Sequence, residues 1–204
     1  MKLLFATLRV IVGVAGLTAV IATFADTASR VAINPLNFFG FFTLQSNILT
    51  AVVLLAAALT TFRGLKQSRG LILARACVTT YIVIVGAVYN TLLVGTPGGG
   101  GVELAWANFV LHIAVPLYVA VDWIFFGDRG RLPRNRFWIV LIYPIVWLAV
   151  VLARGATDGW VPYPFLNPAL GYGVVAVYGI GIAGAIGIVG AAVWALSRLR
   201  ILKP

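Results

Sequence analysis

Residues Leu71–Val94 read LILARACVTTYIVIVGAVYNTLLV, a long apolar run whose single charged side chain is Arg75. An α-helix rises about 1.5 Å per residue, so a run of about 20 apolar residues can cross the hydrocarbon core of a bilayer. The run has no regular alternation of polar and apolar residues, which argues against a barrel strand. This stretch therefore predicts a transmembrane helix.

Further apolar runs lie on both sides of this one. Hydrophobic residues make up 62% of the 204 residues and charged residues only 10%, a balance unlike that of a soluble domain. Backbone groups must be hydrogen-bonded within the chain in hydrocarbon, so helices make the crossings. The sequence predicts an all-α polytopic membrane protein, a six-transmembrane-helix bundle forming a single membrane domain over residues 1–204. The expected spans are Leu3–Phe24, Phe38–Phe62, Leu71–Val94, Val102–Phe126, Phe137–Ala153 and Ala169–Leu196.

The formal net charge of +10 does not indicate a nucleic-acid partner, because the cations form small clusters beside apolar runs instead of one basic face. Cys77 is the only cysteine, so we expect no intramolecular disulfide and a core role for this residue. His112 is the only histidine, and the acidic residues do not cluster with it. We therefore expect no metal site and no cofactor.

The basic clusters predict the orientation of the chain, because basic loops stay on the cytoplasmic side of a membrane. Both termini are therefore expected in the cytoplasm, in a protein of the bacterial plasma membrane. The first run is too long for a signal peptide and carries Arg9, so we expect it to remain as a helix. The clusters are Lys2, then Arg63, Lys66 and Arg69, then Arg129, Arg131, Arg134 and Arg136, and finally Arg198, Arg200 and Lys203.

Polar side chains form two stripes inside the predicted spans. Such residues are costly in hydrocarbon and tend to face the interior of a bundle. Each stripe lies on one helical face, because each residue advances by about 100°. The stripes are Thr43, Asn47 and Thr50 in the second span, and Asn108, His112 and Asp122 in the fourth. Both spans enter from the same side, so we expect Thr43 and His112 to lie at a similar depth.

The charged residues inside the spans have simpler expected roles. Asp122 lies roughly 15 Å along the helix from His112, so we expect it to pair with the basic segment Arg129–Arg136. Arg9 and Arg75 are expected to extend to the cytoplasmic face, with their aliphatic stems in hydrocarbon.

Thr43 and His112 are the minimum set of groups for covalent acyl transfer. A threonine hydroxyl is a poor nucleophile until a nearby base removes its proton. Pro116 cannot donate to the carbonyl of His112, which predicts a kink and a freed acceptor there. Two other interpretations stay open: His112 as a neutral bridge between helices, and Thr43 bonded to its own preceding turn. Candidate donors to a developing oxyanion are Asn47, Asn90 and Asn108.

Several motifs occur in an order that resembles one known family. They are Phe41-Phe42-Thr43, Asn108 four residues before His112, the acid Asp122, and Trp160-Val161-Pro162-Tyr163-Pro164-Phe165-Leu166. Over nearly its whole length the chain resembles the androgen-induced-gene family of membrane hydrolases. The resemblance implies a six-span threonine hydrolase that cleaves fatty-acid esters of hydroxy fatty acids, with Thr43 and His112 as the catalytic pair. Tyr163 is a further candidate contact for the substrate, and membrane lipid is the expected partner.

The chain also resembles compact bacterial relatives with a Thr-Leu-Gln-Ser-Asn stretch, here Thr43–Asn47, for which the resemblance implies no particular activity. The main alternatives to a hydrolase are a proton-coupled or small-solute transporter that uses His112 and Asp122, and a scaffold without catalytic activity.

Small residues recur every fourth position in the last span and predict close helix packing, or a homodimer interface. They are Gly179, Ala183, Gly187, Ala191 and Ala195. The aromatic segment Gly155–Pro168 is expected to be an interfacial anchor, with a lid over a cavity as the alternative.

Overall fold

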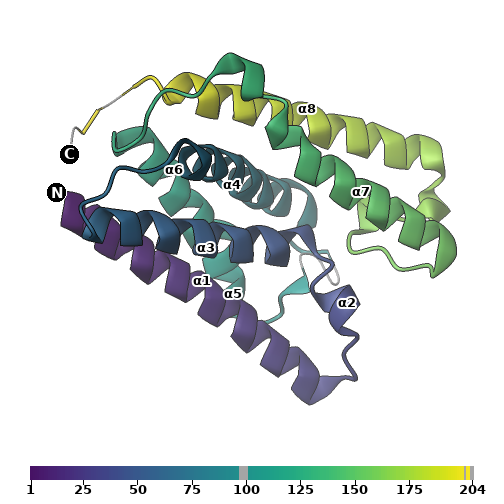
Figure 1. The fold of residues 1–204 in the computed structure, drawn as a ribbon. Coiled ribbons are helices and arrows are strands. Elements are labelled where there is room, and N and C mark those ends of the chain that lie inside the picture. Colours follow the sequence, from purple (N-terminus) through teal and green to yellow (C-terminus); the bar gives the residue numbers. More distant parts are fainter. Residues whose placement is uncertain (97–100, 200, 203–204) are drawn as a thin grey trace.

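A computed structural model describes residues 1–96, 101–199 and 201–202. Arg200 and Lys203 of the last basic cluster lie outside these residues. Within the described residues, six helices are long and apolar enough to cross a membrane (Figure 1). The predicted all-α, six-helix membrane protein is therefore confirmed. Four spans begin and end as single α-helices, namely α1 (Lys2–Arg30), α3 (Phe42–Phe62), α7 (Ile139–Thr157) and α8 (Tyr172–Leu196).

The third and fourth spans each contain a π-helical turn. The third span joins α4 (Arg69–Val88) to the π-helical turn η1 (Tyr89–Leu93). The fourth consists of α5 (Ala105–Phe109), the π-helical turn η3 (Val110–Ala114) and α6 (Val115–Phe125). Such turns are uncommon in proteins, but many of those that exist lie at functional sites. One of the two contains His112, and the other contains Tyr89.

Several expected boundaries are wrong by three to six residues; the fifth span, for example, continues beyond Ala153 to Thr157. The first span continues beyond Phe24 to Arg30, because no proline interrupts it and Thr27 donates its hydroxyl to the carbonyl four residues earlier. The second span begins at Phe42 instead of Phe38. Residues Pro35–Phe38 form the separate short helix α2, so the chain turns before α3 starts.

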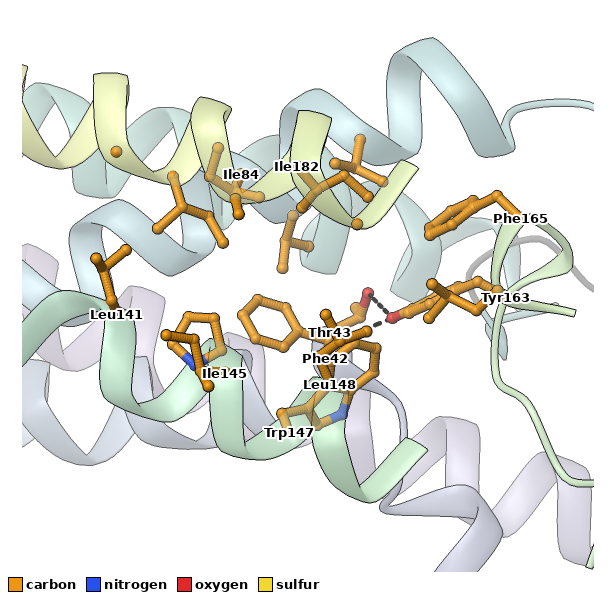
Figure 2. Close-up of a pocket in the computed structure, with 18 of the residues that line it drawn as sticks. Phe42, Thr43, Ile84, Leu141, Ile145, Trp147, Leu148, Tyr163, Phe165 and Ile182 are labelled. Atoms are coloured by element: carbon orange, nitrogen blue, oxygen red, sulfur yellow. Dashed lines mark hydrogen bonds between the residues drawn. The ribbon is translucent and has the colours of Figure 1, made fainter. Parts of the chain in front are cut away.

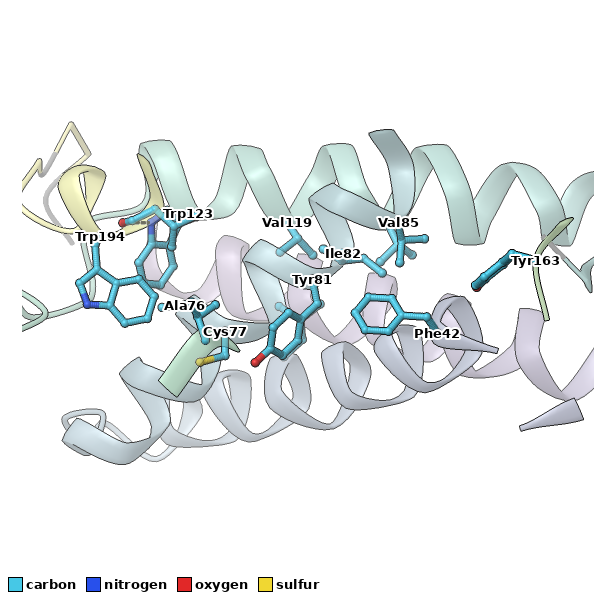
Figure 3. Packing of buried hydrophobic residues seen from close by; sticks show 14 of the residues in the cluster. Phe42, Ala76, Cys77, Tyr81, Ile82, Val85, Val119, Trp123, Tyr163 and Trp194 are labelled. Atoms are coloured by element: carbon cyan, nitrogen blue, oxygen red, sulfur yellow. Dashed lines mark hydrogen bonds between the residues drawn. The ribbon is translucent and has the colours of Figure 1, made fainter. Parts of the chain in front are cut away.

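Helix α4 lies at the centre of the bundle and contacts α3, α6, α7 and α8 (Figure 1). Figure 3 shows its side chains Tyr81, Ile82 and Val85 packed with Phe42 of α3 and Val119 of α6. Cys77 is buried in the same core, as expected. Helices α7 and α8 lie at the periphery, and both expose many large apolar side chains, as expected of surfaces in contact with lipid.

Two arginines and two aspartates form a buried ion cluster at the end of the bundle that holds the N-terminus. Arg9 of α1 lies 2.9 Å from Asp122 of α6 and also pairs with Asp128. Arg75 of α4 lies 2.8 Å from each of the same two carboxylates. Burial opposes ionisation of Asp128, but Arg75 and Arg9 outweigh it and hold its pKa below the ordinary value.

These contacts correct two expectations. Arg9 and Arg75 do not extend to a membrane surface, because both are buried against carboxylates. Asp122 does not pair with the segment Arg129–Arg136, because the two buried guanidiniums already surround it. Arg129 instead lies over the ring of Trp123 at 4.4 Å and donates to backbone carbonyls. Opposite charges inside the bundle thus neutralise one another and join three helices.

Replacing one carboxylate of this cluster is expected to destabilise the whole bundle. Asp122→Ala leaves Arg9 and Arg75 buried with only one carboxylate. Breaking a buried ion pair in this way lowers the free energy of unfolding by about 3–5 kcal/mol. Thermal unfolding of the protein in detergent measures the change. Glu103→Gln is the matched control, because its ion pair with Arg30 is exposed to solvent and contributes little to stability. Equal losses in the two variants would contradict the role given to the cluster.

Candidate functional site

An apolar pocket of about 240 Å³ lies between α3, α4, α7 and α8 (Figure 2). The short 3₁₀-helix η5 (Pro164–Leu166) closes one side of it. Most of its wall is aliphatic or aromatic, and Thr43 with Tyr163 supplies polar atoms. Side chains from all four helices contribute to the apolar wall, among them Phe42, Ile84, Val85, Leu141, Leu148 and Ile182.

The pocket opens toward the surroundings between α7 and α8. Ile145 of α7 lines the pocket and is 60% exposed, and Ala183 of α8 lines it and is also exposed. A residue can line a pocket and face outward only where the pocket reaches the surface. Because α7 and α8 are membrane-spanning, this opening faces lipid, and an apolar chain can enter it from the side.

Thr43 and Tyr163 meet at one end of the pocket. The hydroxyl oxygen of Tyr163 lies 3.3 Å from Oγ1 of Thr43 and accepts a hydrogen bond of 3.2 Å from the backbone N–H of Thr43. Thr43 is the second residue of α3, where backbone N–H groups have no partner within the helix. The alternative in which the threonine hydroxyl bonds only to its own preceding turn is therefore not the observed arrangement.

This geometry leaves the hydroxyl hydrogen of Tyr163 available. Its oxygen already accepts from the backbone of Thr43, so its hydrogen can be donated to Oγ1 of Thr43 or to an oxygen in the pocket. Burial raises the pKa of Tyr163, which keeps the phenol protonated. The positive end of the α3 dipole lies at the same place. The site can therefore bind a carbonyl oxygen at the polar end of a long apolar molecule.

The segment that carries Tyr163 folds inward over the end of α3. Tyr163 and Phe165 are buried and stacked on each other, so they form a wall of the pocket instead of an anchor at the membrane surface. Trp160 lies over the guanidinium of Arg154. Gly40 makes this close approach possible, because a Cβ atom there would lie only 2.3 Å from the ring of Trp160.

His112 lies in a second polar cluster, next to Tyr89. The two rings are stacked, with centroids 3.8 Å apart. Nδ1 of His112 lies 3.2 Å from the carbonyl oxygen of Asn108. A carbonyl only accepts, so Nδ1 carries the hydrogen and Nε2 presents its lone pair. Nε2 is buried and has no hydrogen-bond partner among the described residues.

Two of the three candidate amides stabilise this second cluster. Asn90 donates to the carbonyl of Gly86 in its own helix at 2.7 Å and to that of His112 at 3.5 Å, the carbonyl to which Pro116 cannot donate. Asn108 donates to the hydroxyl of Tyr89. The amides of both residues are thus bonded within the bundle, and neither residue lines the pocket.

Asn47 connects the two polar groups. Its amide donates to the carbonyl of Thr43 at 2.9 Å and to that of Leu111 at 3.3 Å. The turn of α3 that carries Thr43 therefore faces the turn that carries His112, as their predicted depth requires. Within the described part of the chain, however, no hydrogen bond joins the Thr43 and His112 side chains, and His112 does not line the pocket.

Sequence reasoning did not predict that the small-residue stripe of α8 lines this pocket. Gly179, Ala183 and Gly187 belong to its wall, and a Cβ atom added at Gly187 would meet nothing within 4 Å. Close helix packing is therefore not observed at Gly187, whereas a Cβ atom at Gly179 would lie 3.7 Å from Leu148 of α7, which is ordinary packing contact. Pro144 of α7, which also lines the pocket, was missed as well. The signal in the sequence is the stripe of small residues in α8 itself, because small side chains leave room for a groove along a helix.

No family model, curated protein or solved structure matches this chain.

Proposed function

We propose that this protein is an intramembrane hydrolase of lipid esters, with fatty-acid esters of hydroxy fatty acids as its substrate class. One observation carries the proposal: a threonine hydroxyl and a tyrosine hydroxyl lie side by side in an apolar pocket that opens toward lipid. The apolar wall accommodates an acyl chain that enters between α7 and α8. The ester carbonyl then lies against Thr43 and Tyr163.

In the first step, Oγ1 of Thr43 forms a bond to the carbonyl carbon and its proton passes to Nε2 of His112. The carbonyl electrons move onto oxygen, where the Tyr163 hydroxyl and the positive end of α3 stabilise the negative charge. Collapse of this intermediate breaks the ester C–O bond. The imidazolium returns its proton to the leaving alkoxide, so a hydroxy fatty acid departs and an acyl-threonine remains.

In the second step, water adds to the acyl carbon of the acyl-threonine and gives one proton to Nε2 of His112. The intermediate collapses, expels Oγ1 of Thr43 and releases the fatty acid. The proton on His112 returns to Oγ1, which restores the starting state. No oxidant, metal or cofactor takes part in either step.

His112 has the form that a general base requires. Its Nδ1 is oriented by the carbonyl of Asn108, which leaves the lone pair of Nε2 unpartnered in the interior. Asn47 holds the Thr43 turn against the carbonyl of Leu111, the neighbour of His112. We propose that a water molecule carries the proton between Oγ1 and Nε2, because the two side chains do not touch.

Removal of the Thr43 hydroxyl or of the His112 imidazole is expected to reduce or abolish turnover of a branched fatty-acid ester. Mass spectrometry of the released acid measures this turnover. Thr43→Ala lacks the nucleophile and is expected to be inactive. His112→Gln lacks the base and should be slower by about 10²–10⁴-fold. Tyr163→Phe loses an oxyanion donor and should lower kcat by about 10²–10³-fold.

Thr91→Ala is the matched control, since the exposed hydroxyl of Thr91 bonds only to its own preceding turn. Its turnover should equal that of the unmodified protein. Full activity of Thr43→Ala would rule out the hydrolase. If the unmodified protein shows no turnover and Thr43→Ala only changes the melting temperature, the result would instead support a scaffold without catalytic activity.

We also propose that both termini face the cytoplasm of a bacterium. The N-terminus and the end of α8 lie at one end of the bundle, because Phe126 contacts both Phe5 and Leu202. The basic clusters adjoin this end, which favours its retention in the cytoplasm. A tag at the C-terminus should be resistant to protease added to intact cells. Removal of the tag from unbroken cells would contradict this orientation.

A further inference from the structure

A second hollow, of about 450 Å³, lies between the residues that precede α7 and the last turns of α8. The last turns of α8, which line it, lie at the end of the bundle that holds the N-terminus, opposite the start of α3 (Figure 1). Two arginines, Arg134 and Arg198, lie at its rim and are exposed. Its floor is apolar and is made by Phe137, Trp194, Ala191 and Ala195.

The aromatic part of this hollow is held in place by specific contacts. Trp194 is buried, and its indole N–H donates to the carbonyl of Pro133 at 3.3 Å. The ring of Phe137 packs edge-on against it, with centroids 5.5 Å apart. Gly190 lets Phe137 approach α8, since a Cβ atom there would lie 3.2 Å from the ring. The floor is therefore preformed.

The acidic side chains of the chain pair with arginines other than the two at the rim. The chain has five acidic residues in all. Asp122 and Asp128 pair with Arg9 and Arg75, as described above. The other three carboxylates, which are Asp26, Glu103 and Asp158, pair with Arg30 and Arg154. Each acidic side chain is thus matched to an arginine other than Arg134 or Arg198.

The small-residue stripe of α8 connects the second hollow to the apolar pocket. Ala191 and Ala195 line the hollow, and Gly187 and Ala183 line the pocket. These residues recur every fourth position, so they lie on one face of the helix. One leaflet of hydrocarbon is about 15 Å thick, which equals the rise of about ten helical residues. An acyl chain that starts beside Ala195 can therefore reach Gly187.

We propose that this hollow is a binding site for one anionic phospholipid of the surrounding bilayer. The guanidiniums of Arg134 and Arg198 bind the phosphate by charge-assisted hydrogen bonds. The acyl chain lies on the small residues of α8, beside Trp194 at the level of the membrane interface. A lipid with a neutral, zwitterionic headgroup fits the same groove but gains less from the two arginines. The proposal does not depend on the hydrolase activity.

Native mass spectrometry of the purified full-length protein tests the proposal, with equal amounts of phosphatidylglycerol and phosphatidylcholine in the detergent. Phosphatidylglycerol should be retained in roughly 10- to 30-fold preference, the increment expected of two interfacial basic residues. Arg134→Gln with Arg198→Gln should abolish this preference. Ala195→Leu, which fills the groove, should lower the retention of both lipids.

The control removes the same charge from the same end of the bundle: Arg63→Gln with Arg69→Gln should keep the preference unchanged. An equal loss in this control would mean that net charge alone attracts the lipid, and would overturn the site. Unchanged retention in the Arg134 and Arg198 double variant would overturn it too. If inorganic phosphate at millimolar concentration displaces the lipid completely, the hollow is a site for a free anion and the lipid proposal is wrong.

Discussion

The buried ion cluster of Arg9, Arg75, Asp122 and Asp128 is the interaction on which the arrangement of the bundle depends. Four charges in the interior are tolerated only when their signs balance and their hydrogen bonds are made. Here two guanidiniums share two carboxylates, and Gln67 completes the group by bonding to both Arg75 and Asp128. Because the four residues come from α1, α4 and the end of the fourth span, the cluster sets how these helices lie against one another.

The apolar pocket that contains Thr43 lies away from this cluster, toward the opposite end of the bundle. Helices α7 and α8 are the least buried spans, and the pocket lies between them and the central α3 and α4. The polar atoms at its end come from the start of α3 and from the inward-folded segment around Tyr163. The fold thus combines the positive end of a helix, two hydroxyl groups and an apolar wall, which is an arrangement suited to a lipid carbonyl. Each feature follows from a requirement of the membrane: apolar surfaces face lipid, and polar groups pair inside.

The spans, their number and the common depth of Thr43 and His112 could be predicted from the sequence, because hydrophobic runs and helical geometry determine them. The contacts between distant residues could not. Thr43 and Tyr163 are 120 positions apart, and Arg9 and Asp122 are 113 apart, so their pairing depends on how each helix is rotated. Helical periodicity identifies a polar face but not the helix that it meets. For that reason the sequence predicts the wrong partner for Asp122, and it predicts a packing surface where part of the small-residue stripe of α8 lines the pocket.

Mapping the adduct of a fluorophosphonate probe identifies the nucleophile of this protein, because such a probe bonds to an activated hydroxyl and only poorly to an ordinary one. The purified protein is treated with the probe, digested, and sequenced by mass spectrometry. One adduct is expected, on Oγ1 of Thr43, and it should be lost in His112→Gln. An adduct on a different residue, or a protein that carries none, would contradict the assignment of Thr43 as the nucleophile.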